Sequence, residues 1–322
     1  MKAIGITKFG GPETLQPMAM PKPQPKEGQL LVRVYACGAN PVDYKIREGL
    51  LPLPYSFPII LGYDVSGVVE EVGPSVTDFV PGDAVYYSPE LLEPGAYAEY
   101  HVVNASIVTF KPEEISHVEA ASIPLAGMTA WQALFERANL RGGEAVLIHG
   151  AAGGVGSLAV QLASWAGCEV YATASAENHD FVEDLGADVI INYKSHDFVE
   201  AVADATKGRG VDVVLDAIGG EVFAKSFLAV TPGGCVVTIA PEAMGQTPLS
   251  ALAPAYFKNA EAHFLFMQRR RDTLDQLARL LERGFIDPVV ETVLPLERAA
   301  EAHQRLATGH GRGKIVLQIA EE

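Results

Sequence analysis

Residues 145–156 read Ala-Val-Leu-Ile-His-Gly-Ala-Ala-Gly-Gly-Val-Gly, an apolar run that passes directly into a glycine-rich turn. The run predicts a buried strand, and the apolar spacing over residues 155–166 predicts a helix after the turn. Glycines at 150, 153, 154 and 156 leave room for a tight turn, for backbone N–H groups to approach a pyrophosphate and for helix packing. The stretch predicts a dinucleotide site, although Ala152 interrupts the strict G-x-G-x-x-G spacing. The alternative is a tight turn in a fold that binds no nucleotide.

Strand-helix units continue on the C-terminal side of this turn. Apolar runs predict strands at 145–148, 170–174, 189–191, 211–215 and 236–239, and amphipathic stretches predict helices at 155–166, 178–185, 198–206 and 222–230. The alternation predicts an α/β domain, a doubly wound parallel sheet covered by helices on both faces. Beyond about residue 241 we expect a strand at 263–267, helices at 272–283 and 296–307 and a last strand at 314–319.

The N-terminal third has a different pattern. Short β-branched runs at 30–35, 65–72, 84–87 and 97–103 are separated by glycine and proline, which predicts a β-rich, barrel-like domain. Because prolines are frequent between residues 25 and 83, we expect no helix longer than a short turn there. The last segment is too short to be a domain and is expected to complete the first one.

Composition limits the partners of this chain. The 322 residues include 24 Lys and Arg against 40 Asp and Glu, and the net charge of −16 disfavours nucleic acid and anionic membranes as partners. The three cysteines, Cys37, Cys168 and Cys235, form no C-x-x-C pair and are expected to be reduced thiols. The N-terminus resembles no signal or transit peptide, so a cytoplasmic protein is expected.

The end of the second strand of the parallel sheet bears on the choice of cofactor. It reads Tyr-Ala-Thr-Ala-Ser over 171–175 and carries no acid to bind a ribose 2′-hydroxyl. Ser175, Asn178, His179 and Tyr193 could bind a 2′-phosphate instead. Glu177 opposes this, and no Arg or Lys is expected beside it to neutralise its charge. NADPH is therefore favoured, and NADH is not excluded.

Six motifs occur in the order in which a known family has them. They are NPVDYKIREG at 40–49, LGYDVSGVVEEVG at 61–73, VPGDAV at 80–85, ASIPLAGMTAW at 121–131, HGAAGGVG at 149–156 and GRGKIV at 311–316. Together they resemble the medium-chain dehydrogenase/reductase superfamily and, within it, the zinc-free quinone oxidoreductases related to zeta-crystallin. The resemblance implies a GroES-like catalytic domain at 1–118, completed by 262–322, and a Rossmann NADP-binding domain at 119–261. It also implies a cofactor cleft where the domains meet, and a homodimer.

The residues present also bear on zinc. A catalytic zinc needs about three Cys, His or carboxylate ligands. Zinc-dependent relatives would have a ligand Cys near Asn40 and a ligand His at the place of Gly-Tyr-Asp 62–64, and this chain has neither. No H-E-x-x-H pair occurs either. We expect no metal.

Without a Lewis acid, a conjugated acceptor such as a quinone or enone is favoured over an ordinary alcohol or ketone. Asn40 is the candidate catalytic residue, as a donor to the acceptor oxygen, and the alternative is a turn residue before Pro41. The substrate pocket is expected to include Tyr44, Lys45, Leu51 and Tyr63. Leu51 stands where several relatives have a Tyr, so an acid role for that Tyr is not carried over.

The resemblance also implies cofactor contacts. The expected cofactor-binding residues are Asn40, Thr129, Ala152, Gly153, Gly154, Val155, Ser175, Asn178, Tyr193, Ile218, Ile239, Ala240, Phe264, Phe266 and Lys314. Lys314 could reach the cofactor or pair with Asp64, and the alternative is a surface lysine.

Two other functions stay open. The first is a 2-enoyl thioester reductase of the same fold, for which a basic groove would be needed. The one basic cluster, Arg-Arg-Arg at 269–271, is interpreted as a solvated helix start. The second is a nicotinamide-binding sensor or structural protein with little turnover.

Overall fold

The computed structural model describes residues 1–240, 249–309 and 311–321. The chain divides into two compact units. Unit 1 comprises Met1–Met128, Arg269–Gly284 and Pro288–Glu322, and unit 2 comprises Thr129–Gln268 and Phe285–Asp287. These divisions fall ten and seven residues after the expected ones at 118/119 and 261/262.

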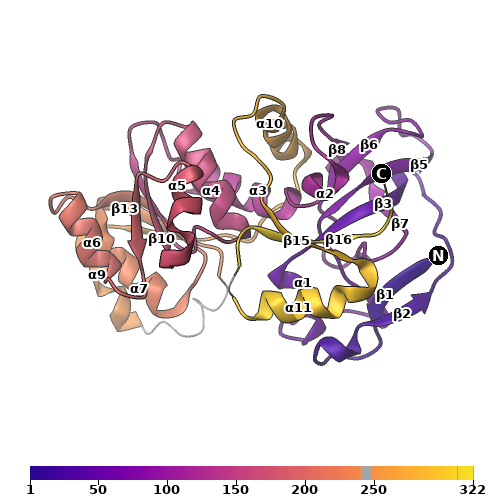
Figure 1. The fold of residues 1–322 in the computed structure, drawn as a ribbon, viewed down its shortest axis with the longest axis horizontal. Helices are drawn as coiled ribbons and strands as arrows, with labels where there is room; N and C mark the ends of the chain where they lie inside the picture. The colour runs from indigo at the N-terminus through magenta and orange to yellow at the C-terminus, as the bar shows by residue number, and fades with distance from the viewer. Residues whose placement is uncertain (241–248, 310, 322) are drawn as a thin grey trace. The chain divides into compact units, whose positions relative to one another are not determined.

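Unit 2 contains a six-stranded parallel sheet of order β11-β10-β9-β12-β13-β14 (Figure 1). Its strands are β9 (Ala145–Ile148), β10 (Glu169–Ala174), β11 (Val189–Asn192), β12 (Val211–Asp216), β13 (Val230–Thr238) and β14 (Glu261–Phe264). The order reverses beside β9, as expected for a doubly wound fold, because successive strands are added first on one side of β9 and then on the other. The predicted parallel sheet is confirmed.

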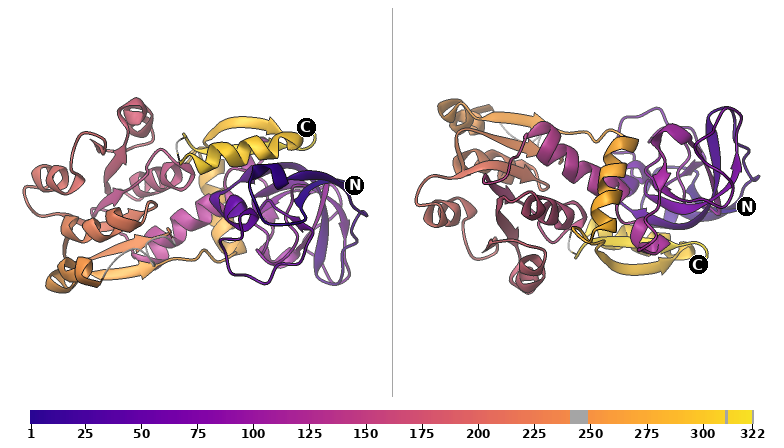
Figure 2. Two further views of the ribbon diagram at one scale, coloured as in Figure 1. Left: turned by 90° about the horizontal axis from the view of Figure 1, so that it is seen from below. Right: turned by 90° about the horizontal axis from the view of Figure 1, so that it is seen from above.

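Helices cover both faces of this sheet (Figure 2). They are α4 (Gly154–Trp165), α5 (His179–Asp184), α6 (Phe198–Ala205), α7 (Gly220–Ala229) and α9 (Ala253–Lys258), with short turns η4 (Ala176–Asn178) and η5 (Leu249–Leu252) and a π-helix, η3 (Gln132–Arg137). Leu147 of β9 packs with Phe198 of α6 and Phe223 of α7. Val146 and Ile148 alternate with Leu147, are fully buried and therefore face the opposite side, which α4 covers.

Unit 1 is rich in β-strands, as its short β-branched runs predict, and its strands pair antiparallel except for β15 and β16, which are parallel. A seven-stranded sheet has the order β15-β16-β3-β5-β6-β8, with β7 also paired to β3, and a small sheet has the order β2-β1-β4. Their strands are β1 (Lys2–Ile6), β2 (Gln16–Ala19), β3 (Gln29–Ala39), β4 (Ile59–Ile60), β5 (Val65–Val72), β6 (Ala84–Tyr87), β7 (Tyr100–Asn104), β8 (Thr109–Phe110), β15 (Val290–Pro295) and β16 (Lys314–Gln318). The C-terminal β16 pairs with β3 near the start of the chain, so the last segment does complete this unit.

The helices of unit 1 include one that the sequence did not predict. They are α1 (Pro41–Arg47), α2 (His117–Ala120), α10 (Arg271–Glu282) and α11 (Ala299–Ala307), with the turns η1 (Pro12–Thr14), η2 (Ala105–Ile107) and η6 (Leu296–Arg298), while α3 (Pro124–Trp131) crosses the division between the units. The expectation of no helix longer than a short turn between residues 25 and 83 is wrong, because α1 has seven residues. Pro41 stands at the first helical position, where its missing N–H costs nothing, and the Asp43 carboxylate accepts from the Asn40 N–H at 2.6 Å.

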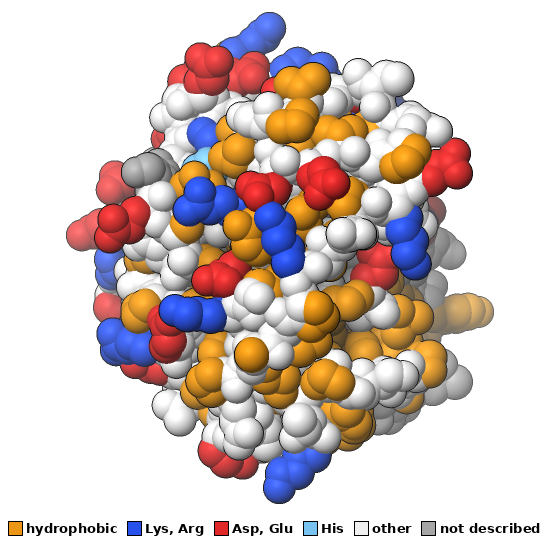
Figure 3. Space-filling view, turned by 90° about the vertical axis from the view of Figure 1, so that its right-hand side faces the viewer, with side chains coloured by type: hydrophobic (Ala, Val, Ile, Leu, Met, Phe, Trp, Pro, Cys, Tyr) orange, Lys and Arg blue, Asp and Glu red, His pale blue; other side chains and the backbone are white. Residues whose placement is uncertain are grey.

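One face of unit 1 carries mixed charge. Figure 3 shows the face near the N-terminal strands, where acidic, basic and apolar side chains are interspersed. That face presents no large patch of a single sign. Among the described residues, no helix is long and apolar enough to cross a membrane.

Candidate functional site

The glycine turn ends β9 and begins α4. Gly150 has φ +68°, a left-handed conformation that favours glycine, and a Cβ on Gly156 would lie 2.2 Å from the Gly150 oxygen. Gly153 is the N-cap of α4, and no side chain caps this helix. The first N–H groups of the helix, on Gly154, Val155 and Gly156, therefore have no intrahelical acceptor. They form a cradle of donors suited to a pyrophosphate.

Buried side chains support this turn through hydrogen bonds. His149 lies between two hydroxyls, with Nδ1 at 3.2 Å from Thr173 Oγ1 and Nε2 at 3.2 Å from Ser226 Oγ. The Thr173 hydroxyl also accepts from the Gly150 N–H at 3.3 Å. Burial lowers the pKa of His149 to about 3, so the ring is neutral at physiological pH. His149 thus supports the turn and carries no charge toward a ligand.

Three polar residues follow β10. Ser175 Oγ donates to Glu177 Oε1 at 2.9 Å and accepts from Asn178 Nδ2 at 3.2 Å. Ser175 is buried at the end of the strand, whereas the Glu177 side chain is 70% exposed. Two of the residues predicted to bind a 2′-phosphate, Ser175 and Asn178, are therefore hydrogen-bonded to each other, and the opposing Glu177 is bonded to Ser175.

A lysine lies beside Glu177, so the expectation of no basic neighbour is wrong. Lys194 Nζ is 3.6 Å from Glu177 Oε1, and both side chains are more than half exposed. Parallel pairing of β10 with β11 sets Ala174 opposite Asn192, which brings the residues after Asn192 beside the residues after Ala174. Tyr193, also predicted at this site, is 49% exposed. The local charge at the 2′ site is therefore balanced.

The ends of β12 and β13 complete the carboxyl edge of the sheet. Asp216 Oδ1 accepts from the Ile218 N–H, and the Asp216 backbone oxygen accepts from the Ile239 N–H, both at 3.0 Å. The Ala240 N–H donates to Thr238 Oγ1 at 3.2 Å. Ile218 is left half exposed at this edge. These candidates share the edge with the glycine turn because parallel strands end on one side of a sheet.

The other cofactor candidates of unit 2 differ in exposure. Ala152 is buried in the glycine turn, and Thr129 is buried in α3. The Phe264 ring is half exposed and lies 5.6 Å from the Phe223 ring, between centroids, and Phe266 is 68% exposed. Phe266 therefore presents most of its ring to solvent or a ligand.

Unit 1 contains a buried ion pair at the candidate catalytic residue. Lys314 Nζ lies 2.8 Å from Asp64 Oδ2 and also donates to Asn40 Oδ1. Asn40 Nδ2 donates to Asp64 Oδ2 at 2.8 Å and to the Gly38 oxygen at 3.2 Å. Because Lys314 can only donate, it determines which end of the amide faces it. Both amide hydrogens of Asn40 are consequently engaged within the chain.

Two buried carboxyls lie in this cluster. Asp43 accepts from the Asn40 N–H and, at 2.9 Å, from the Gly62 N–H, and Asp64 accepts from the Leu125 N–H at 2.5 Å. Burial raises the pKa of Asp43 to about 7 against these backbone donors. Burial also raises the pKa of Asp64, and Lys314 opposes the shift. The cluster thus binds α1 and the residues 62–64 to β16.

The expected pocket residues of unit 1 differ in how deeply they are buried. Tyr63 is fully buried and donates to the Leu91 oxygen at 3.2 Å, and burial raises the pKa of its hydroxyl far above the usual value. Tyr44, Lys45 and Leu51 are half-buried. Tyr63 therefore serves as a packed residue and a poor proton donor. Within residues 1–240, 249–309 and 311–321, no group of three His, Cys, Asp or Glu side chains is placed to hold a metal.

Two residues of unit 1 were not singled out as site residues. Tyr55 places its hydroxyl out of solvent with no hydrogen-bond partner among the described residues. Arg269 was expected to be solvated, and this is wrong, since its side chain is 5% exposed and its Nε donates to the Pro89 oxygen at 2.6 Å. A tyrosine in a proline-rich loop and an arginine at a helix start carry no sequence signal for such burial.

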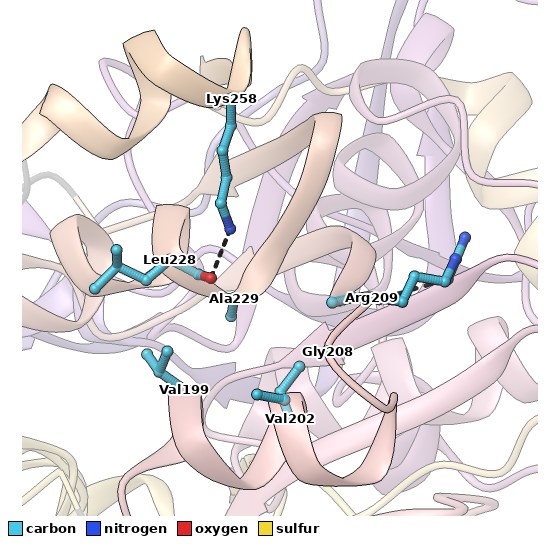
Figure 4. Close-up of a pocket in the computed structure, with 9 residues that line it drawn as sticks. Val199, Val202, Gly208, Arg209, Leu228, Ala229 and Lys258 are labelled. Atoms are coloured by element: carbon cyan, nitrogen blue, oxygen red, sulfur yellow. Dashed lines mark hydrogen bonds between the residues drawn. The ribbon is translucent and has the colours of Figure 1, made fainter.

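A small pocket in unit 2 lies away from these groups. It has a volume of about 40 Å³ and is lined by residues of α6, α7 and α9, among them Val202 and Lys258, and by the loop that contains Gly208 (Figure 4). Lys258 Nζ donates to the Leu228 and Val230 oxygens, both at 2.7 Å. Gly208 precedes β12, so the pocket lies at the amino ends of the strands, opposite the glycine turn. With room for about one water, it is no cofactor site.

Comparison with known proteins extends over the whole chain. A family model for the alcohol dehydrogenase GroES-like domain matches residues 26–113, and one described as zinc-binding dehydrogenase matches residues 185–317. The chain is 32% identical over 328 residues to a quinone oxidoreductase of Mus musculus, covering 99% of this chain and 98% of the mouse protein.

Solved structures show the same extent of similarity. The Escherichia coli quinone oxidoreductase complexed with NADPH has a TM-score of 0.91 and 31% identity, covering 99% of this chain and 100% of that one. A structure named NAD-dependent alcohol dehydrogenase has a TM-score of 0.93 and 33% identity, with the same coverage. The similarity therefore includes both the β-rich and the parallel-sheet parts of the chain.

Proposed function

Because the chain belongs to the quinone oxidoreductase family of the medium-chain dehydrogenase/reductase superfamily, we propose that it reduces quinones or other conjugated carbonyl compounds with NADPH and without zinc. As a member of this family, the chain is an NAD(P)H oxidoreductase. The uncapped glycine turn at the carboxyl edge of the parallel sheet is the observation that carries the cofactor part of the proposal.

The residues of unit 2 fit a nicotinamide dinucleotide. The first N–H groups of α4, on Gly154 and Val155, suit the pyrophosphate, and side-chain-free backbone at Gly153 allows its close approach. Ile218 and Ala240, at neighbouring strand ends, suit the apolar parts of the cofactor. Once bound, the nicotinamide supplies the hydride, and the protein orients it and excludes water.

The preference for NADPH rests on the groups after β10 and β11. Lys194 offers a cation, and Ser175, Asn178 and Tyr193 offer hydrogen bonds to a 2′-phosphate. Glu177 is the opposing residue, since its carboxylate would repel a phosphate and could accept from a ribose hydroxyl. The Lys194 ammonium at 3.6 Å offsets that charge, which favours NADPH over NADH.

Zinc independence rests on the donor set in unit 1. Neither an amide at Asn40 nor a phenol at Tyr63 is an ordinary zinc ligand. The oxygens of Asn40 and Asp64 already hold the Lys314 ammonium, so a second cation at those oxygens would meet a like charge. The lysine thus neutralises the buried carboxylate that a metal would otherwise need to neutralise.

The same cluster supports the proposed acceptor class. Both amide hydrogens of Asn40 are used by Asp64 and Gly38, so Asn40 offers no spare donor to polarise an ordinary ketone. A quinone or enone needs less polarisation, because conjugation spreads the developing negative charge. Water can protonate the reduced quinone, so no dedicated acid is required.

The alternative of an enoyl thioester reductase finds less support. Arg270 Nε bonds to Asp272 at 3.0 Å and Arg271 bonds to Asp78 at 2.9 Å, while Arg269 is buried. The basic cluster is thus largely neutralised within the chain and offers little to an anionic pantetheine tail.

The test is the steady-state oxidation of NADPH by the purified protein with three classes of acceptor. We expect turnover with 1,4-benzoquinone or 9,10-phenanthrenequinone and little with a crotonyl thioester, and trans-2-enals test the enone part. Preference for the thioester would favour the alternative reductase. Tight NADPH binding with no turnover on any acceptor would favour the sensor. The expected homodimer and cytoplasmic location stay predictions.

A further inference from the structure

The chain passes between the two units at four places. These are within α3, after Gln268, before Phe285 and after Asp287. A continuous helix carries the first of them, whereas the other three lie in backbone outside helices and strands. Because such backbone bends more easily than a helix, the contacts that hold these three crossings determine where the chain can bend between the units.

Gln132 holds the crossing after Gln268 to unit 2. It is the first residue of η3, and its side chain is buried. Its Nε2 donates to the Gln268 backbone oxygen at 2.7 Å, and its Oε1 accepts from the Gln268 N–H at 2.9 Å. The side-chain amide therefore pairs with both backbone groups of one residue, as a neighbouring strand would. Unit 2 thus holds the chain up to the last residue before this crossing.

Gln161 makes the same pair of bonds at the crossing after Asp287. This buried residue of α4 donates through Nε2 to the Asp287 backbone oxygen at 3.1 Å, and its Oε1 accepts from the Asp287 N–H at 2.7 Å. Nε2 also donates to the Ser157 oxygen, one turn earlier in α4, at 3.2 Å, so both hydrogens of the amide are used. The helix that begins at the glycine turn therefore also holds the end of the segment 285–287.

A ring contact and burial hold the start of that segment. The Phe285 ring lies 6.5 Å, between centroids, from the ring of Trp165 at the end of α4, and Ile286 is buried. On the other side of the crossing, the Gly284 N–H donates to the Leu281 oxygen at 3.0 Å, which ties Gly284 to the end of α10. Gly284 has φ +65°, a conformation that favours glycine, so the chain turns sharply where it leaves unit 1.

Unit 1 holds the chain just beyond the other two crossings. Arg269 directly follows one of them, and its buried side chain donates through Nε to the Pro89 oxygen at 2.6 Å. Val289 follows the other, with Pro288 between them, and its oxygen accepts from the Lys314 N–H at 2.9 Å. The backbone between residues held by opposite units is therefore very short at each crossing.

We propose that the two units move against each other about three short pivots, at the bond between residues 268 and 269, at the bond between residues 284 and 285, and at Pro288. Gln132 and Gln161 keep two of these pivots short. Units joined by short pivots rotate as rigid bodies, whereas longer unbound linkers let them adopt many positions. Loss of either glutamine frees the residues before its pivot and so lengthens it.

The test is the distribution of distances between two spin labels, one in each unit. The labels are attached at Glu71→Cys of β5 and Glu200→Cys of α6, both exposed positions, and the three native cysteines are buried. Pulsed electron paramagnetic resonance measures the width of the distribution. We expect a single narrow distribution in the parent and a wider one in the double variant Gln132→Met/Gln161→Met, because methionine has a similar length and forms no comparable hydrogen bonds.

Gln29→Met is the matched control. The Gln29 Oε1 accepts from the Lys26 N–H at 3.0 Å within unit 1, away from every crossing, so this variant should keep the width of the parent. A double variant with the width of the parent, or an equally wide distribution in Gln29→Met, would overturn the proposal.

Hydrogen exchange of the parent tests the same bonds without a substitution. The N–H groups of Gln268 and Asp287 should exchange at least about a hundredfold more slowly than in an unfolded chain, since each is held by a buried amide. Exchange of both groups at the unfolded rate would contradict the pivots, whether or not the methionine variants fold.

Discussion

Lys194 gives a sharp test of the cofactor proposal, through Lys194→Met. Its ion pair with Glu177 spans 3.6 Å between side chains that are 53% and 70% exposed, so its loss should cost the fold less than about 1 kcal/mol. A hydrogen bond from the ammonium to a 2′-phosphate contributes about 1.5–3 kcal/mol, and solvent exposure favours the lower value. We therefore expect kcat/KM for NADPH to fall about tenfold, while the value for NADH, which lacks the phosphate, hardly changes.

The companion change, Glu177→Gln, should act in the opposite direction. Two negative charges roughly 5 Å apart in water repel by about 0.8 kcal/mol, so removing the carboxylate should raise kcat/KM for NADPH about fourfold. Arg209→Met is the control, because it removes a 57% exposed cation that is paired with Asp212 near the amino end of β12, away from the glycine turn.

The assay is the ratio of kcat/KM for NADPH to that for NADH, at one low salt concentration because salt screens the phosphate contribution. An unchanged ratio in both Lys194→Met and Glu177→Gln would show that these residues do not contact the 2′ position. A parent that prefers NADH tenfold would show that Glu177 binds the ribose hydroxyls and that the choice of NADPH is wrong.

Three further predictions concern the turn, the metal and a buried histidine. Gly154→Val should abolish NADPH binding in calorimetry with the circular dichroism spectrum unchanged, because a branched side chain blocks the pyrophosphate, and parent-like affinity would refute the phosphate site. Activity should persist in EDTA with no stoichiometric zinc in elemental analysis, and loss of a bound zinc together with activity would contradict the role of Lys314. His149 has a folded pKa of about 3, below its unfolded value near 6.5, so the unfolded chain binds the extra proton and stability is lost as pH falls below about 6.5. Urea unfolding at pH 7 and pH 5 gives the change in the free energy of unfolding with pH. This change should be smaller in His149→Asn than in the parent, by up to about 1.4 kcal/mol per pH unit, and equal changes in the two proteins would refute the role of His149.

Local pattern was sufficient for much of the fold. The strands β5 (Val65–Val72), β6 (Ala84–Tyr87) and β9 (Ala145–Ile148) begin and end at the predicted residues. The glycine turn was also predictable, because its requirements, a left-handed φ at Gly150 and close approach at Gly156, are met within a few residues. Both features depend on neighbours in the chain, so the sequence contains the information that specifies them.

Predictions from local sequence were wrong where one residue type can occupy two different structural positions. Prolines were interpreted as helix breakers, yet Pro41 begins α1, since the first helical position needs no N–H. Arg269 was interpreted as part of a solvated helix start, yet its side chain is buried and donates to the Pro89 oxygen, 180 positions away in the sequence.

The sequence by itself determined the two kinds of sheet, the dinucleotide turn and the resemblance to the family, because periodicity and motif spacing are local properties. Only the tertiary structure decided the partners of the site residues. Pairing of β16 with β3 brings Lys314 to Asn40 across 274 positions and engages the amide that had been predicted to meet the acceptor. Pairing of β10 with β11 brings Lys194 to Glu177 in the same way. Strand register sets these contacts, and register is a property of the folded sheet as a whole.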